Sequence, residues 1–273
     1  MNKRPIAVNT NTYHGFSLQE ALDNIAEIGY HNIELTATDG WTEHVHRTMS
    51  MHELVAIKQE IARLGLNVVG MSGHTNLMDP TRLGDFIDNM HLAHFFDSKY
   101  IVTSVGEAHL EDANHASDDQ LRQNIQKVIP YLNLLDLQLT IEVHGDHGTG
   151  KRIQEIIDPL DNPRVGIAYD TANAIFYGEG DMYEDLESVV DDISYVHLKD
   201  KDGAKQEWNF PAIGKGTLDF KRIFELLDSS DRIIPISIEI EFTQAGPKDI
   251  DEVNQALRDS KDTLEKLGCD IHG

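Results

Sequence analysis

The sequence alternates short, apolar, β-rich runs with amphipathic stretches of helical length, and this alternation restricts the fold more than any other feature. The runs predicted as strands cover residues 5–10, 32–37, 67–72, 100–105, 139–144, 165–170, 193–198 and 234–240. The stretches predicted as helices begin at Leu18 and after Ser50, and then cover residues 80–96, 117–134, 150–157, 181–191, 219–228 and 250–267. Because strands separated by helices pair in parallel, the pattern predicts an α/β protein with a parallel sheet.

Several of the predicted helices carry boundary signals. Ser17 with Glu20, and Ser50 with Glu53, have the spacing of a capping box, in which two side chains satisfy backbone N–H groups at the helix start. Three predicted helices are followed by a glycine of the kind that ends a helix in the left-handed conformation, namely Gly29, Gly65 and Gly268.

The number of strand–helix units favours one closed barrel over an open sheet. Eight units in 273 residues match a (β/α)8 TIM barrel, which takes about 250 residues. No GxGxxG motif follows the first strand and no GxxxxGK[ST] motif occurs, so the nucleotide-binding open sheets lack their fingerprint. No segment rich in Pro, Gly or Ser divides the chain. We therefore expect a single (β/α)8 TIM barrel domain over residues 1–273.

Composition argues against several function classes. Asp and Glu number 47 against 23 Lys and Arg, a net charge of −24, whereas nucleic-acid binding needs a basic face. No apolar run reaches the roughly 20 residues of a membrane span, and the start MNKRPIAVNTNTY lacks the apolar core of a secretory signal. The single cysteine, Cys269, builds no disulfide framework. We expect a cytoplasmic protein that binds neither nucleic acid nor membranes.

The last four predicted strands each end in a side chain that can bind a metal. These residues are Glu142, Asp170, His197 and Glu239, and the carboxyl ends of barrel strands meet at one mouth. Carboxylates crowded there repel one another and are costly to bury, and a divalent cation removes that cost. Three carboxylates with one imidazole suit Mn²⁺, Mg²⁺ or Co²⁺, and Zn²⁺ is also compatible. The sequence predicts one divalent metal ion and no other cofactor.

Five sequence motifs resemble the xylose-isomerase-like TIM-barrel superfamily of sugar isomerases and epimerases. They are FSLQEALDNIAEIGYHNIEL, GIAYDTAN, YVHLKDKDG, IGKGTLDF and ISIEIEF, and the likeness covers nearly the whole chain. The group includes tagatose/psicose 3-epimerases, hydroxypyruvate isomerase and inosose dehydratase. The resemblance implies a metal, Mn²⁺ before the others, held by the four residues above. It also implies a homo-dimer or homo-tetramer.

The resemblance further implies that Glu142 and Glu239 act both as ligands and as the acid–base pair. We assign the base to Glu142 and the acid to Glu239, an assignment that the sequence leaves open to reversal. Two positions depart from the epimerases of the group. Asn173 stands where they usually have a substrate-binding His, and Gly203 stands where they tend to have an Arg. Both departures disfavour a standard ketose 3-epimerase.

Four residues near the predicted mouth are candidates for substrate binding: His74, His144, Asn173 and Lys199. His144 could instead orient a metal ligand, and Lys199 could instead neutralise excess carboxylates. Asn9 and Asn11 are candidates for the pocket floor, and Glu34 is open between the site and a core hydrogen bond. Most of the loop histidines are expected to be solvated: His44, His46, His109, His115 and His147.

The predicted function is carbohydrate metabolism by a metal-dependent isomerase or epimerase that transfers a proton on the carbon next to a carbonyl of a small sugar or sugar derivative. A lyase of the inosose dehydratase type would use the same metal and base to remove a proton and expel a hydroxyl group. A non-catalytic sugar-binding barrel is a third hypothesis. An endonuclease IV-like nuclease is disfavoured by the net charge and by the few histidines at strand ends.

Overall fold

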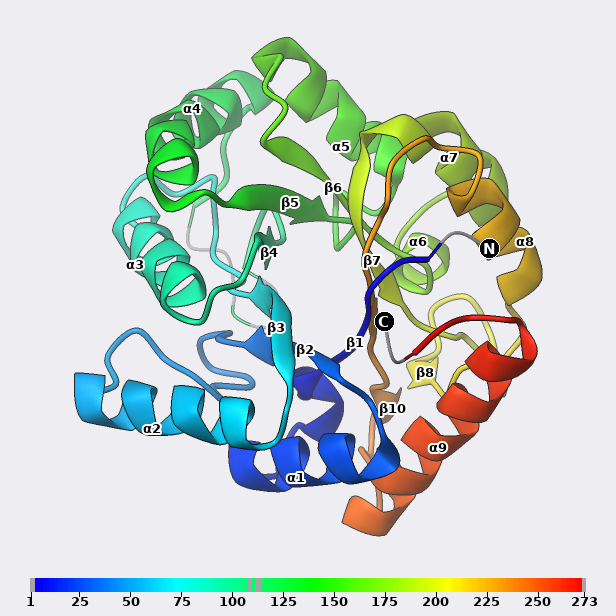
Figure 1. Ribbon diagram of the computed structural model, residues 1–273. Helices are drawn as coiled ribbons and strands as arrows, with labels where there is room; N and C mark the ends of the chain where they lie inside the picture. Colours follow the sequence, from blue (N-terminus) through cyan, green and yellow to red (C-terminus); the bar gives the residue numbers. More distant parts are fainter. Residues whose placement is uncertain (1–2, 108–109, 111–113, 272–273) are drawn as a thin grey trace.

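A closed barrel of parallel strands forms the centre of the protein (Figure 1). The computed structural model describes residues 3–107, 110 and 114–271. The barrel strands are β1 (Ile6–Asn9), β2 (Asn32–Thr36), β3 (Asn67–Ser72), β4 (Tyr100–Thr103), β5 (Gln138–Glu142), β6 (Val165–Asp170), β7 (Ile193–Leu198) and β9 (Ile236–Ile238). Each pairs with its neighbour in chain order, and β9 pairs with β1 to close the barrel. The predicted (β/α)8 TIM barrel is confirmed.

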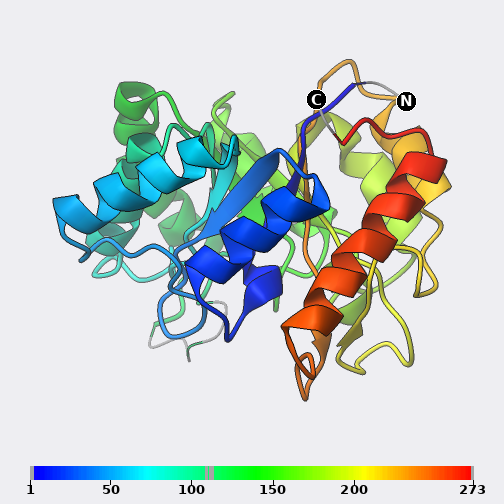
Figure 2. The same ribbon diagram turned by 60° about the horizontal axis from the view of Figure 1, so that its bottom comes forward.

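The predicted helices surround the barrel, as the two ribbon views show (Figures 1 and 2). They are α1 (Leu18–Ile28), α2 (Met51–Arg63), α3 (Leu83–Phe95), α4 (Asp118–Leu135), α5 (Gly150–Ile157), α7 (Met182–Val189), α8 (Phe220–Leu227) and α9 (Ile250–Lys266). Both capping boxes are formed, and Gly29 ends α1 with a φ of 97°. Within the described residues, no helix is long and apolar enough to cross a membrane.

The start of α3 differs from the prediction. A helix was expected from residue 80, but α3 begins at Leu83. The carboxylate of Asp79 accepts hydrogen bonds from the backbone N–H and the hydroxyl of Thr81, at 2.8 and 2.7 Å. This local turn competes with the helix and delays its first residue.

Several short elements at the mouth of the barrel were not predicted. A 3-10 turn (Thr10–Tyr13) follows β1, and a short helix, α6 (Asn173–Phe176), follows β6. An antiparallel ribbon joins β8 (Asn209–Phe210) to β10 (Phe242–Thr243). The ribbon links the segment after β7 to the segment after β9, so it ties together the ends of two strands that carry candidate ligands.

Tyr195 fills the barrel interior beneath the mouth. It is fully buried, and it packs with Val102 and Ala168 in a cluster separate from the main core between barrel and helices. A Cβ on Gly70 would lie 2.5 Å from the Tyr195 hydroxyl, so only glycine leaves room for this ring. Tyr195 therefore occupies the barrel interior beneath the carboxyl ends of the strands, where the active sites of such barrels lie.

Candidate active site

Four neighbouring strands bring the predicted ligands together. Glu142 and Asp170 are the last residues of β5 and β6, His197 lies in β7, and Glu239 directly follows β9. Each offers one ligand atom, and these atoms all lie within 4.8 Å of one another. All four side chains are buried, and Asp170 and His197 have no exposed surface. The geometry is that of a single site able to hold one ion.

One oxygen of Asp170 is committed to the backbone and the other is not. Oδ1 accepts from the N–H groups of Ala172 and Asn173, at 2.9 and 2.8 Å. Among the described residues, Oδ2 has no hydrogen-bond partner although it is buried. It faces Nζ of Lys199 at 3.2 Å, an ion pair without hydrogen-bond geometry. A buried carboxylate oxygen left in this way fits a metal ligand.

His197 is held from both sides of its ring. Nδ1 lies 2.5 Å from Oε1 of Glu142 and 3.6 Å from Oε2 of Glu239. Nε2 lies 3.0 Å from each oxygen of Glu34, a fully buried residue of β2. Glu34, which the sequence left open between site and core, is therefore a hydrogen-bond partner of a candidate ligand.

Lys199 extends into the same cavity from the end of β7. Its Nζ lies 2.7 Å from Glu241, 3.0 Å from Glu239 and 3.2 Å from Asp170. Burial alone would lower the pKa of Lys199, but the surrounding carboxylates outweigh this and hold its pKa well above the usual value. The side chain is thus a fixed positive charge at the site.

The carboxylates differ in how they respond to this environment. Burial raises the pKa of Asp170 to about 7, against the opposing charge of Lys199. Burial acts in the same direction on Glu142, but His197 and His74 outweigh it and lower its pKa. Lys199 and His197 likewise overcome burial and lower the pKa of Glu239. The site therefore contains more negative charge than its own cations neutralise, which a divalent cation would correct.

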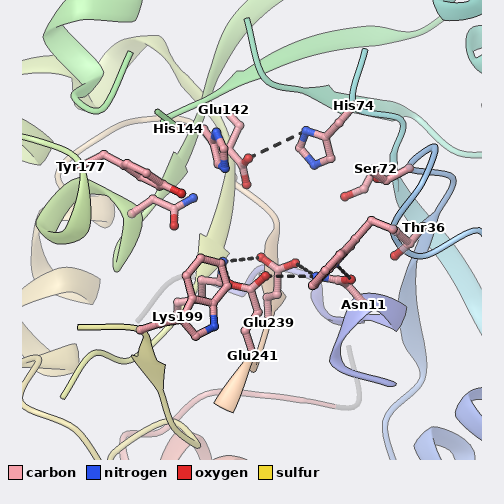
Figure 3. Close-up of a pocket in the computed structure, with 14 residues that line it drawn as sticks. Asn11, Thr36, Ser72, His74, Glu142, His144, Tyr177, Lys199, Glu239 and Glu241 are labelled. Atoms are coloured by element: carbon pink, nitrogen blue, oxygen red, sulfur yellow. Dashed lines mark hydrogen bonds and ion pairs between the residues drawn. The ribbon is translucent and has the colours of Figure 1, made fainter. Parts of the chain in front are cut away.

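Two of the candidate ligands, Glu142 and Glu239, line a pocket at the mouth of the barrel (Figure 3). All four predicted substrate-binding residues are among its lining, and side chains from both halves of the barrel point toward its centre. Trp41 and Trp208 lie at its edge and also line a wider, more apolar groove outside it. The polar inner pocket thus continues into an apolar entrance.

Two histidines of the pocket present defined hydrogen-bonding groups. Nδ1 of His74 accepts the backbone N–H of Ser104 at 3.0 Å, so its other ring nitrogen carries the proton. His144 packs against Tyr177, with ring centroids 4.8 Å apart. Burial lowers the pKa of His144 to about 4, so this ring is neutral at pH 7. Both side chains are suited to hydrogen bonds with hydroxyl or carbonyl oxygens.

Asn11 links the pocket edge to a candidate ligand. Its Nδ2 donates to Oε1 of Glu239 at 2.8 Å, and its Oδ1 accepts from Nε1 of Trp41 at 3.0 Å. Trp41 is stacked on His14, with ring centroids 3.9 Å apart. Asn9 also donates to Glu239, at 3.3 Å, from the 0% exposed interior of the barrel. The two asparagines that were candidates for the pocket floor both contact Glu239.

The sequence did not predict some residues of the pocket, and the expected exposure of one loop histidine was wrong. Tyr177, Thr36 and Ser72 line the pocket without having been predicted. No sequence pattern pointed to Tyr177, because its place in the pocket depends on the short helix α6, which was not predicted. His44 was grouped with solvated loop histidines but is 8% exposed, and its Nε2 contacts the carbonyl oxygen of Phe16 at 3.1 Å. His109 lies outside the described residues.

Residues 22–266 match the model of the xylose isomerase-like TIM barrel. The chain belongs to this family.

Curated relatives within the family are inosose dehydratases. That of Klebsiella pneumoniae subsp. pneumoniae is 26% identical over 176 residues, which cover 54% of this chain and 59% of the relative. That of Erwinia tasmaniensis is 24% identical over 247 residues, which cover 76% of this chain and 82% of the relative. The first match thus spans less than two thirds of its relative's length.

Solved structures with low sequence identity to this chain have the same fold. D-psicose 3-epimerase, determined in the presence of D-fructose, superposes with a TM-score of 0.78 at 13% identity and covers 98% of this chain and 100% of its own. A xylose isomerase-like TIM barrel protein from Mycobacterium smegmatis in complex with magnesium superposes with a TM-score of 0.77 at 14% identity over 100% of both chains. The family therefore includes sugar-modifying enzymes.

Proposed function

We propose that this protein is a divalent-metal-dependent isomerase or epimerase that moves a proton on the carbon next to a carbonyl of a small sugar or sugar derivative. The observation that carries the proposal is the convergence of Glu142, Asp170, His197 and Glu239 at the barrel mouth. The epimerase fold and the magnesium complex among the family structures support it.

These four residues would hold the ion, Mn²⁺ before Mg²⁺, Co²⁺ or Zn²⁺. The fit rests on the buried, uncommitted oxygen of Asp170 and on a donor set of three carboxylates and one imidazole. When bound, a divalent cation supplies Lewis acidity that stabilises negative charge developing on substrate oxygens.

The proton transfers are assigned to Glu142 and Glu239. They come from strands separated by β6 and β7, so they can approach a substrate from different directions. Glu142, whose pKa is lowered, is ionised at neutral pH and can accept a proton. Glu239 returns a proton to the opposite face in an epimerase, whereas in an isomerase a single carboxylate carries it between neighbouring carbons.

The other pocket residues position the substrate. The Lys199 ammonium can bind a carbonyl, carboxylate or phosphate oxygen, and the proton on His74 can be donated to a hydroxyl. His144 and Asn173 also line the pocket and offer further polar groups. Trp41 and Trp208 line the pocket, where their rings would shield a bound substrate from water.

A dehydratase of the inosose type is the second candidate function. The curated relatives carry this name, and the two departures from the epimerases, Asn173 and Gly203, leave the ketose-specific contacts incomplete. In this reaction Glu142 would take the proton next to the carbonyl. The neighbouring C–O bond would break, and the departing hydroxyl would accept a proton and leave as water.

The assembly and location expected from the sequence complete the proposal. We infer a homo-dimer or homo-tetramer that acts on small soluble molecules in the cytoplasm, without nucleic-acid or membrane partners. The net charge of −24 supports the exclusion of nucleic acid, the lack of an apolar run of roughly 20 residues supports that of membranes, and the single Cys269 supports the reducing compartment. Light scattering of the purified protein tests the assembly.

One experiment separates the two candidate reactions. The protein is stripped with a chelator, reloaded with Mn²⁺, and incubated in D₂O with ketoses, aldoses, keto-cyclitols and their phosphates. We expect deuterium to enter next to the carbonyl without loss of water, as followed by NMR and mass spectrometry. Loss of water establishes the dehydratase. Absence of both reactions together with absence of stoichiometric metal binding refutes the metal-dependent function, and a Glu142→Gln variant serves as the inactive control.

A further inference from the structure

One fully buried carboxylate at the site lies outside the ligand group. Glu34 is 0% exposed in the middle of β2, two residues before the strand ends at Thr36. Among the described residues, the buried group with ligand atoms within 4.8 Å does not include Glu34. A strand rises about 3.3 Å per residue, so this position is below the mouth. The burial of Glu34 therefore needs an explanation other than metal ligation.

The two ring nitrogens of His197 face different neighbours. Nδ1 faces the candidate ligands Glu142 and Glu239, at 2.5 and 3.6 Å, whereas Nε2 faces both oxygens of Glu34 at 3.0 Å. A nitrogen that binds a metal uses its lone pair, so the other nitrogen carries the ring proton. The geometry thus selects Nδ1 for the metal and the Nε2–H group for Glu34.

Glu34 is itself held in place by a buried network. The hydroxyl of Ser72 donates to Oε1 of Glu34 at 2.6 Å. Nδ2 of Asn9 lies 3.3 Å from the Ser72 hydroxyl and also 3.3 Å from Oε1 of Glu239. All three residues of this network are at most 1% exposed, so water does not compete for its hydrogen bonds. The network runs through β1, β2 and β3 and contacts two of the four candidate ligands.

We propose that Glu34 is the positioning residue that fixes His197 as an Nδ1 metal donor, with Ser72 and Asn9 holding Glu34. This inference rests on the metal-dependent function proposed above. A carboxylate that accepts the distal N–H of a ligand histidine fixes its tautomer and ring orientation and makes the ring a stronger donor. Strands β1 to β3 therefore organise a metal centre whose ligands come from β5, β6, β7 and the end of β9.

The test measures metal binding and the histidine tautomer rather than turnover. Mg²⁺, which is diamagnetic, is titrated calorimetrically into the unaltered full-length protein and into Glu34→Gln, Ser72→Ala and Glu27→Gln variants. Glu27 is an exposed residue of α1, so its replacement controls for the loss of one negative charge. Ring-nitrogen NMR of labelled histidine identifies the protonated nitrogen of His197 in the Mg²⁺ form, with a His197→Gln spectrum for assignment.

We expect the Mg²⁺ affinity of Glu34→Gln to fall about 10- to 100-fold, that of Ser72→Ala to fall less, and that of Glu27→Gln to be unchanged. In the unaltered protein the ring proton is expected on Nε2. A proton on Nδ1 in the Mg²⁺ form, or equal affinities for Glu34→Gln and Glu27→Gln, overturns the inference while metal binding stands. If the unaltered protein binds no metal ion, the proposed function fails instead. The tautomer measurement decides the question even if Glu34→Gln does not fold.

Discussion

Nζ of Lys199 lies 3.0 Å from Oε2 of Glu239, so this pocket lysine contacts a candidate metal ligand directly. It also faces the uncommitted oxygen of Asp170 at 3.2 Å. The ammonium and the expected metal ion therefore share two carboxylates, and both bring positive charge to the place where substrate oxygens would bind.

Replacement of Lys199 by methionine separates these two sources of charge. Because the ammonium can stabilise charge on the substrate, we expect kcat/KM of Lys199→Met to fall about 100-fold. Metal stoichiometry should be retained, since all four ligands are intact. Steady-state kinetics and metal analysis of the same preparation check both expectations. Activity within about threefold of the unaltered protein would assign Lys199 to charge neutralisation alone.

Metal binding is expected to depend on pH through Asp170. Burial raises the pKa of this carboxyl to about 7, so below pH 7 it is protonated and the ion must displace a proton. Through this carboxyl, affinity should therefore fall about tenfold for each pH unit below 7. Titration calorimetry in buffers of different ionisation enthalpy measures the released proton. Binding without proton release at pH 6 contradicts the prediction.

Glu239 and Glu241 are two residues apart but differ in role. Glu239 belongs to the group of ligand atoms, whereas Glu241 pairs with Lys199 at 2.7 Å outside it. We expect Glu239→Gln to weaken metal binding about 100-fold or more, and Glu241→Gln to retain one bound ion per chain. Elemental analysis after gel filtration, with identical buffers for both variants, distinguishes them. Loss of the ion from both proteins would mean that Glu241 is also a ligand.

Gly216 is expected to be intolerant of any side chain. The buried carboxylate of Asp200 accepts the N–H groups of Gly214 and Gly216, at 2.9 and 2.7 Å, and a Cβ on Gly216 would collide with that carboxylate. Gly216→Ala should lower the free energy of unfolding by about 1–3 kcal/mol. A Cβ on Gly84, in α3, meets nothing within 4 Å, so Gly84→Ala should be neutral or stabilising. Urea unfolding of both variants tests the contrast.

The barrel was predictable because its signals are local. Apolar runs, capping boxes and terminal glycines each involve a few neighbouring residues, and the closed barrel follows from their alternation. The meeting of Asp170 and His197 was also predictable in outline, because the carboxyl ends of barrel strands converge. They are opposite each other in the β6–β7 register. The metal-binding role assigned to them stays a prediction.

The alternation of side chains between the two faces of a strand did not predict how deep a side chain lies along the barrel axis. Glu34 and Glu142 both face inward, but Glu142 ends its strand and Glu34 lies two residues below the end of its own. Alternation indicates which face of a strand a side chain occupies but not how deep it lies in the barrel. The difference between the candidate ligand Glu142 and its proposed support Glu34 is therefore visible only in three dimensions. The β8–β10 ribbon was also not predictable from local patterns, because it pairs residues more than thirty positions apart in the sequence.

That ribbon has a consequence for how molecules reach the pocket. Because Phe210 pairs with Phe242, the segment after β7 cannot swing outward alone without breaking this pairing. A movement that opens the pocket on this side must therefore carry both segments together. These segments follow β7 and β9, the strands that support His197 and Glu239. Passage of substrate and product on this side would therefore shift the surroundings of two candidate ligands together, and the segment after β1 is joined to the same place by the hydrogen bond from Asn11 to Glu239.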